Sequence, residues 1–250
     1  MVRTMIADTA YWRVWEDNFS RSQPADYERN LRLVEALWEE ALLLGAFPQE
    51  DAFNNIPAKT RRERAFMFRD LLVRMAGEFE RRAIAYMLIG GQAVLLYGEP
   101  RLTADVDVTV GVPPEQLPTV LDVVRTLGWQ VLVQNPHDFV RRTLVLPCRD
   151  EATGIRIDII FAQSTYEQQA LQRVRRVPMG DVQVCFASAE DVVIQKLVAG
   201  RPRDIEDARR IWLKNPHMDE EYIRHWLQQF EEALSEPFLA RFEEIQRESG

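Results

Sequence analysis

The chain has 250 residues, of which 46% are hydrophobic and 28% charged, proportions typical of a globular protein with a sizeable core. Its formal net charge of −8 disfavours nucleic acid as a partner. Much of this negative charge, however, lies in residues 216–250, which contain nine acidic residues and three arginines. No apolar run approaches the ~20 residues of a membrane span, and the N-terminus lacks the apolar core of a signal peptide, so we expect a cytoplasmic protein with no membrane partner.

The first 80 residues carry two stretches with helical periodicity. Apolar residues recur at helical spacing over 27–44, and again after a capping box formed by Thr60 and Glu63. The second stretch continues its apolar face to Phe79. We therefore expect 1–80 to form a helical extension that packs on the rest of the chain.

The stretch from residue 84 to 110 is the most informative part of the sequence. An apolar run over 84–89 ends at Gly90 and Gly91, and the composition predicts a strand, a Gly-Gly turn and a short helix over 92–97. Residues 105–110 alternate Asp or Thr with Val, which predicts a second strand. Because side chains alternate across a strand, Asp105 and Asp107 are expected on the same face.

Two neighbouring carboxylates are unfavourable unless a cation lies between them, because like charges raise each other's pKa. Mg²⁺ prefers hard oxygen ligands and keeps coordination positions open for phosphates. A glycine turn that opens a helix directs backbone N–H groups at an anion. Asp105, Asp107, Gly90 and Gly91 together therefore predict a nucleotide site with a divalent metal.

Later elements alternate between helix and strand. We expect helices over 114–127 and 164–171, strands over 129–134, 143–148 and 154–161, and a hairpin of 176–179 with 182–186. Asp158 lies within the isoleucine-rich strand, where a lone carboxylate is costly. It either pairs with Arg156 on the same face or provides a third metal ligand. Cys148 and Cys185 have no metal-ligand spacing, so we expect reduced structural thiols.

The C-terminal quarter is expected to be helical. A helix over 189–199 carries Lys196 among apolar residues, where the lysine either reaches solvent or contacts a phosphate. Asp204 and Asp207 follow, with the possibility that they only orient Lys196 or the nearby arginines. Two further helices are expected within 218–248, with a break at Pro237.

The order Gly90-Gly91-Gln92-Ala93, Arg101, Thr103, Asp105, Asp107 resembles the opening motif of the nucleotidyltransferase superfamily that includes DNA polymerase beta. Within it, the chain is most similar to the bacterial branch of abortive-infection AbiEii-type toxins and their uncharacterised relatives. The resemblance implies an α+β (mixed α/β) fold, with a mixed-sheet core at 81–186 and a C-terminal helical region at 187–250. It also implies Asp105, Asp107 and Asp158 as catalytic ligands of Mg²⁺ or Mn²⁺. Its other expected site residues are the nucleotide-binding Gly90, Gly91, Arg101, Thr103 and Lys196 and the supporting Arg201 and Asp204.

The resemblance implies transfer of a nucleoside monophosphate from an NTP to an acceptor hydroxyl on tRNA or protein, in a toxin–antitoxin setting with a cognate partner. One alternative is an antibiotic-modifying enzyme with a small-molecule acceptor, because such enzymes also carry Gly-Gly-x-Ala. Another is a binding or antitoxin module without turnover. A dinucleotide-binding dehydrogenase is poorly supported, because no third glycine completes the G-x-G-x-x-G spacing.

Overall fold

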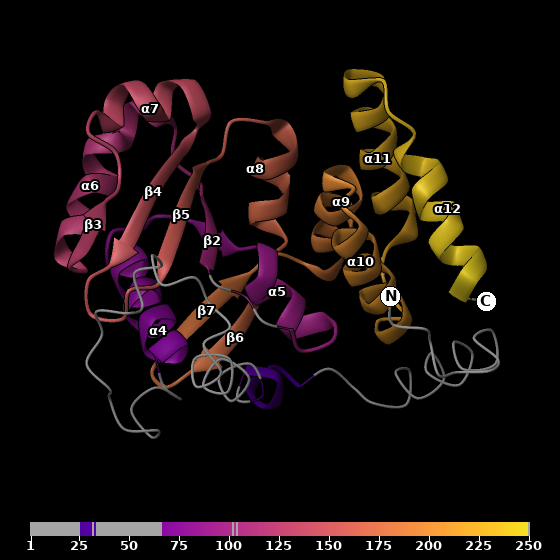
Figure 1. The fold of residues 1–250 in the computed structure, drawn as a ribbon, viewed down its shortest axis with the longest axis horizontal. Coiled ribbons are helices and arrows are strands. Elements are labelled where there is room, and N and C mark those ends of the chain that lie inside the picture. The colour runs from indigo at the N-terminus through magenta and orange to yellow at the C-terminus, as the bar shows by residue number, and fades with distance from the viewer. Residues whose placement is uncertain (1–25, 32, 34–66, 102, 104, 250) are drawn as a thin grey trace, which may run out of the picture. The chain divides into compact units, whose positions relative to one another are not determined.

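The computed structural model describes residues 26–31, 33, 67–101, 103 and 105–249 (Figure 1). Most of the helix expected over 27–44, and the capping box at Thr60, lie outside these residues. The chain divides into two compact units. The sheet unit comprises Glu28–Leu95 and Pro100–Ser188, and the helical unit contains Leu96–Glu99 and Ala189–Gly250. The three-part division expected from the sequence, at residues 80 and 186, stays a prediction.

The sheet unit is built on seven strands in the order β3-β4-β5-β2-β1-β7-β6. The pairs β2–β5 and β1–β7 are parallel and the other neighbours are antiparallel, so the sheet is mixed and the expected mixed α/β fold is confirmed. The strands are β1 (Tyr86–Leu88), β2 (Asp105–Val110), β3 (Trp129–Val131), β4 (Val145–Asp150), β5 (Arg156–Phe161), β6 (Arg175–Met179) and β7 (Val182–Phe186).

The central strands bury one face and leave the other partly open. On the buried face, Val106 lies beside Ile157, which lies beside Cys148, and all three are fully buried. Helix α4 (Met67–Arg81) is joined to this face, since Arg74 forms an ion pair of 3.0 Å with the buried Asp150. Burial of these apolar side chains is the main force that holds the strands in place.

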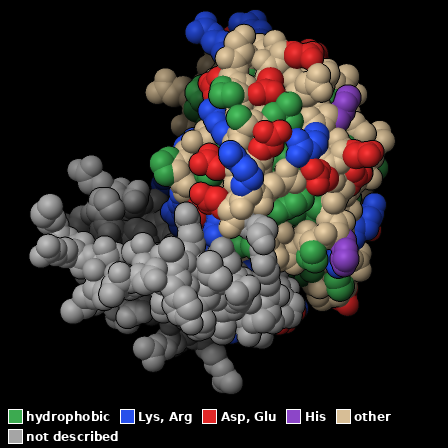
Figure 2. Space-filling view, turned by 90° about the vertical axis from the view of Figure 1, so that its right-hand side faces the viewer, with side chains coloured by type: hydrophobic (Ala, Val, Ile, Leu, Met, Phe, Trp, Pro, Cys, Tyr) green, Lys and Arg blue, Asp and Glu red, His purple; other side chains and the backbone are tan. Residues whose placement is uncertain are grey.

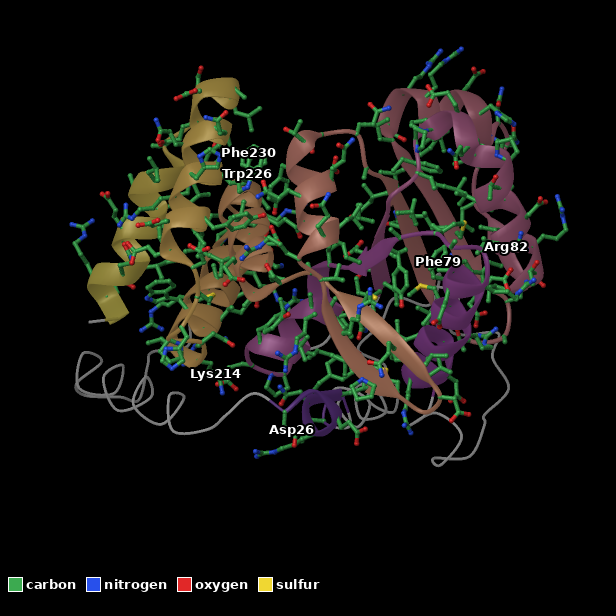
Figure 3. The ribbon with its side chains drawn as sticks, turned by 180° about the vertical axis from the view of Figure 1, so that it is seen from behind. Asp26, Phe79, Arg82, Lys214, Trp226 and Phe230 are labelled. Atoms are coloured by element: carbon green, nitrogen blue, oxygen red, sulfur yellow. The ribbon has the colours of Figure 1, made fainter. Side chains whose placement is uncertain are left out.

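Aromatic packing adds to the core of the sheet unit. Phe79 of α4, labelled in Figure 3, is fully buried, and its ring centroid lies 5.0 Å from that of Tyr86 on β1. At this separation the two rings pack favourably beyond their burial. The apolar face expected up to Phe79 is therefore confirmed over the described residues of α4.

The remaining helices that begin within the sheet unit follow local signals. Helix α5 spans Gly90–Tyr97, α6 spans Leu117–Thr126 after a short 3₁₀ turn at Pro114–Gln116, and α8 spans Thr165–Gln172. The capping box of α8 is complete, because Ser164 accepts from the Glu167 N–H and Glu167 accepts from the Ser164 N–H.

One helix was missed from the sequence. Helix α7 covers Pro136–Thr143, where Asn135 caps the start and Pro136 takes the first position. The strands expected over 129–134 and 143–148 are therefore wrong at these ends: β3 stops at Val131 and β4 begins at Val145. Thr143 belongs to the helix, and its hydroxyl donates to the Phe139 carbonyl.

The helical unit contains α9 (Ala189–Ala199), α10 (Pro202–Lys214), α11 (Glu220–Leu234) and α12 (Phe238–Ser249). Helix α9 contacts α10, α11 and α12, and α12 also contacts α10 and α11. The two expected C-terminal helices with a break before Phe238 are confirmed. None of the described helices combines the length and hydrophobicity needed to cross a lipid bilayer.

Acidic and basic side chains are interspersed on the face shown in Figure 2. Within the helical unit, acidic and basic side chains also form ion pairs one helical turn apart, including Arg210 with Glu206 at 2.7 Å and Arg224 with Glu220 at 2.8 Å. The acidic excess of the C-terminal sequence is thus partly neutralised locally, within single helices.

Candidate active site

Three carboxylates meet on the open face of the central strands. In the parallel pair β2–β5, Asp107 lies directly opposite Asp158, and Asp105 lies opposite Arg156. Ligand oxygens of Asp105, Asp107 and Asp158 all lie within 4.8 Å of one another, and each residue is half-buried. The expected meeting of the three acidic residues at one point is confirmed. This donor set consists of hard oxygen ligands and fits a divalent cation such as Mg²⁺ or Mn²⁺.

Arg156 forms a two-pronged ion pair with Asp158. Arg156 Nε donates to Asp158 Oδ1 at 3.0 Å, and an Arg156 terminal nitrogen lies 2.9 Å from Asp158 Oδ2. The hydrogen bond to Asp158 raises the pKa of Arg156, and the negative charges of Asp158, Asp105 and Asp107 add to the effect. The pairing of Asp158 with Arg156 is therefore confirmed, while the role of Asp158 as a third metal ligand stays a prediction.

The two glycines allow the start of α5 to approach the acidic strand. Gly90 has φ +60°, and a Cβ at this position would lie 2.0 Å from Asp107 Oδ2. A Cβ at Gly91 would lie 2.2 Å from Thr103 Oγ1. Both glycines belong to the first turn of α5, so the expectation that the helix begins only at residue 92 is wrong. Only residues without a side chain allow this close approach.

Thr103 supports one of the carboxylates. Its side chain is almost fully buried, and its hydroxyl lies 3.3 Å from both Asp105 Oδ1 and the Asp105 carbonyl oxygen. Arg101 lies in the loop before β2 and is half-buried. The nucleotide-binding roles expected for Thr103 and Arg101 stay predictions, while the contact of Thr103 with Asp105 is a property of the fold.

The cysteines provide no nucleophile for this site. Both Cys148 and Cys185 are free and buried, as the sequence predicted. Burial, together with a smaller effect of the nearby charge of Asp158, raises the pKa of the Cys148 thiol to about 12. Burial also raises the pKa of Cys185. Both thiols therefore stay protonated near neutral pH and are poor nucleophiles.

A second charged cluster lies within the helical unit. Lys196 is buried, and its Nζ lies 2.6 Å from Asp204 Oδ1 and 3.1 Å from Asp207 Oδ2. The alternative in which Lys196 extends to solvent is therefore wrong. Arg201 is 83% exposed, and its Nε lies 3.9 Å from Asp204 Oδ2, a distance too long for a strong hydrogen bond. A phosphate-binding role for Lys196 stays a prediction.

Two arginines on the open face were missed as functional candidates. The sequence pattern indicates Arg156 only as a partner of Asp158 and indicates no role for Arg149. In the antiparallel pair β4–β5, Arg149 lies directly opposite Arg156. Side-chain alternation along each strand indicates which residues of that strand share a face. The register between β4 and β5 cannot be read from the sequence, so the position of Arg149 opposite Arg156 was not predictable.

A protein-family comparison agrees with this geometry. The family model described as a nucleotidyltransferase of unknown function (DUF6036) matches residues 69–236. This span includes all three carboxylates of the open face and the Lys196 cluster. No curated protein matches the chain.

Solved structures with a related chain path include three nucleotidyltransferase-type proteins. The antibiotic-resistance factor ANT(2″)-Ia is 17% identical with a TM-score of 0.47, over 67% of this chain and 95% of that one. An antigenic nucleotidyltransferase-like protein from Paracoccidioides brasiliensis is 17% identical with a TM-score of 0.44, over 67% and 88%. The lincomycin-bound lincosamide adenylyltransferase LnuA is 18% identical with a TM-score of 0.42, over 57% and 94%. The family match covers more than half of the chain, and on this basis the chain belongs to the nucleotidyltransferases of unknown function (DUF6036).

Proposed function

We propose that this chain is a metal-dependent nucleotidyltransferase that moves a nucleoside monophosphate from an NTP to an acceptor hydroxyl and releases pyrophosphate. The observation that carries the proposal is the convergence of Asp105, Asp107 and Asp158 from two parallel neighbouring strands. Carboxylates this close repel one another, and a divalent cation held between them removes the repulsion.

Each residue of the site has a part in this proposal. Asp105 and Asp107 bind the metal ions, with Asp158 as an additional ligand on the β5 side. Bound Mg²⁺ or Mn²⁺ supplies Lewis acidity at the phosphoryl oxygens and lowers the pKa of a coordinated hydroxyl. Thr103 holds Asp105 in place through its hydrogen bond of 3.3 Å. Backbone N–H groups at Gly90 and Gly91 bind the triphosphate, because the first turn of a helix favours anions.

The transfer step forms one bond and breaks another. The acceptor oxygen forms a bond to the α-phosphorus while the bond from that phosphorus to the pyrophosphate oxygen breaks. We assign the proton of the acceptor hydroxyl to Asp158. Lys196 and Arg101 are the cations we assign to the charge of the triphosphate, on the sequence motif alone. No histidine is required as a base, because the Asp158 carboxylate takes the proton.

The class of acceptor can be determined by comparing candidate acceptors in the same assay. The toxin-like resemblance favours tRNA or protein as acceptor and a cognate antitoxin as partner. The Gly90-Gly91-Gln92-Ala93 motif also favours a small-molecule acceptor, because antibiotic-modifying nucleotidyltransferases carry the same Gly-Gly-x-Ala. An acceptor screen with tRNA, a protein extract and aminoglycosides, read by transfer of label from α-³²P-NTP, separates these candidates.

The decisive variant is Asp105→Ala. We expect it to abolish label transfer and pyrophosphate release, because the metal loses a central ligand. The matched control is Asp122→Ala, which removes an exposed carboxylate of α6 that pairs with Arg125 at 2.7 Å. Unchanged transfer by Asp105→Ala contradicts the proposal. Calorimetric NTP binding without pyrophosphate release, even with acceptors present, identifies a binding module instead.

A further inference from the structure

Positive charge follows the acidic cluster along the same sheet face. Asp105 on β2 lies opposite Arg156 on β5, and Arg156 lies opposite Arg149 on β4, so the three residues form one row across three strands. Neighbouring strands are about 5 Å apart, which places the Arg149 backbone about 10 Å from that of Asp105. A transition from negative to positive charge thus occurs over a single row of residues.

The two arginines of this row are in different states. Arg156 is held by both oxygens of Asp158. Arg149 Nε is buried but has no hydrogen-bond partner among the residues that the structure describes. A buried donor without a partner is destabilising, and so are like charges directly opposite each other on neighbouring strands. An anion bound between Arg149 and Arg156 would satisfy the donor and remove the repulsion.

Metal binding at Asp158 makes this position more favourable for an anion. Both carboxylate oxygens of Asp158 contact Arg156, so a cation ligated by Asp158 competes with the guanidinium for the same atoms. With Arg156 released, two residues that lie directly opposite each other on β4 and β5 each have a guanidinium group able to bind an anion. Guanidinium groups bind phosphate through pairs of parallel hydrogen bonds.

The position of the arginines separates them from the glycine turn. Strand β2 has β1 on one side and β5 on the other, and the glycine turn follows β1. Arg156 and Arg149 are on β5 and β4, on the opposite side of the acidic strand. If the triphosphate binds at Gly90 and Gly91, the anion at the arginines belongs to the other substrate. This step rests on the proposed function.

We propose that Arg149 and Arg156 form a phosphate-binding subsite for the acceptor, so that the acceptor carries a phosphate near its reactive hydroxyl. The 3′ end of an RNA strand has this chemistry, and so does a nucleoside monophosphate. A polycationic aminoglycoside is positively charged, as the arginine pair is, and is therefore repelled by it. The subsite therefore selects among the acceptors left open above.

The test measures binding of a fluorescein-labelled single-stranded oligoribonucleotide with a free 3′-hydroxyl to the full-length chain with Mg²⁺, by fluorescence anisotropy. We expect Arg149→Gln to weaken binding about tenfold, because a charge-assisted contact to phosphate is lost. Arg149→Lys keeps the positive charge but loses the bidentate guanidinium group. We expect its affinity for the strand to lie between those of the wild type and Arg149→Gln. Arg125→Gln, an equal change of charge on exposed α6, leaves binding within about twofold.

Four results overturn the proposal, three of them from the strand and NTP affinities of the variants. The first is equal affinity of Arg149→Gln and the wild type for the strand, when circular dichroism shows both folded. The second is equal weakening by Arg125→Gln. The third is loss of NTP affinity in Arg149→Gln with strand affinity intact, which assigns the arginine to the nucleotide. If Arg149→Gln does not fold, the same criteria apply to Arg149→Lys.

A competition arm distinguishes the source of the phosphate. A nucleoside monophosphate and an unlabelled dinucleotide are each tested as competitors of the labelled strand. If both displace the strand at the same concentrations, the subsite binds a single phosphate. If the monophosphate displaces the strand less well, the subsite binds a strand. Both results support the subsite. Calorimetric binding of an aminoglycoside that is unaffected by Arg149→Gln, without strand binding, overturns it.

The subsite and the transferase activity fail in different ways. If strand binding depends on Arg149 but the wild type transfers no NMP, the subsite is supported and the proposed transferase activity is wrong. If NMP transfer depends on Asp105 but strand binding does not depend on Arg149, the transferase activity is supported and the subsite is wrong.

Discussion

Glycine serves two different purposes in this chain. Gly90 and Gly128 both have positive φ, +60° and +69°, a backbone conformation that costs other residues free energy. A Cβ at Gly128 would meet nothing within 4 Å, whereas one at Gly90 would collide with Asp107. Gly90 is therefore required for the geometry of the carboxylates, while Gly128 is required only for the turn.

This contrast predicts separate effects of two equal substitutions. We expect Gly90→Ala and Gly128→Ala each to lower the free energy of unfolding by about 1–2 kcal/mol, from the left-handed backbone alone. Only Gly90→Ala should also displace Asp107 and weaken Mn²⁺ binding, by about 10–100-fold, as for other changes that misplace metal ligands. Urea unfolding and Mn²⁺ titration by electron paramagnetic resonance measure the two effects. Equal Mn²⁺ affinities for the two variants would contradict this account.

At the scale of helices, α9 and α10 are joined by a buried charge cluster. Lys196 of α9 contacts Asp204 and Asp207 of α10, and the three side chains are each about nine-tenths buried. Removing the lysine takes away a cation that both carboxylates contact, and such a loss within a buried cluster is more destabilising than the loss of a surface ion pair.

Lys196→Met is therefore expected to lower the free energy of unfolding by about 3–5 kcal/mol. Arg125→Met is the control, because it breaks the exposed pair with Asp122 and should cost no more than about 1 kcal/mol. Urea unfolding followed by circular dichroism measures both. Similar losses for the two variants would show that the Lys196 cluster contributes no more than a surface pair. NTP affinity of Lys196→Met, measured where the variant is folded, tests its nucleotide role separately.

At the scale of the whole molecule, the two units are interleaved along the chain. Leu96–Glu99, from the middle of the sequence, belongs to the helical unit. Lys214, labelled in Figure 3, lies 3.0 Å from Glu99, and the Asn215 side chain donates to the Tyr97 carbonyl. The three carboxylates of the open face, by contrast, all lie within the sheet unit.

Metal binding should therefore stabilise the folded chain through the sheet unit. At about 100 times its dissociation constant, Mn²⁺ is expected to add about 2.7 kcal/mol to the free energy of unfolding of the unit that binds it. Differential scanning calorimetry should show a higher melting temperature with Mn²⁺ for the wild type and a much smaller rise for Asp158→Asn. Asp122→Asn, which alters an exposed carboxylate, should respond as the wild type does. An equal rise for Asp158→Asn would exclude Asp158 as a ligand.

Local patterns were enough to predict several parts of this structure. Alternation along a strand depends only on backbone geometry, so Asp105 and Asp107 were correctly placed on one face. The helix expected over 164–171 was also predicted correctly, because the capping box that starts α8, Ser164 with Glu167, has contacts that span only three residues. Helix α7 was missed although Asn135 and Pro136 mark its start, because eight residues carry too little periodicity.

The amino-acid sequence by itself determined which side chains share a strand face, where most helices begin, and which acidic residues suit a divalent cation. Tertiary structure alone decided that Asp158 lies opposite Asp107, that Arg149 lies opposite Arg156, and that Lys196 is enclosed by two carboxylates. The reason is physical: local patterns arise from neighbouring residues, whereas register and burial depend on which distant segments pair when the core forms.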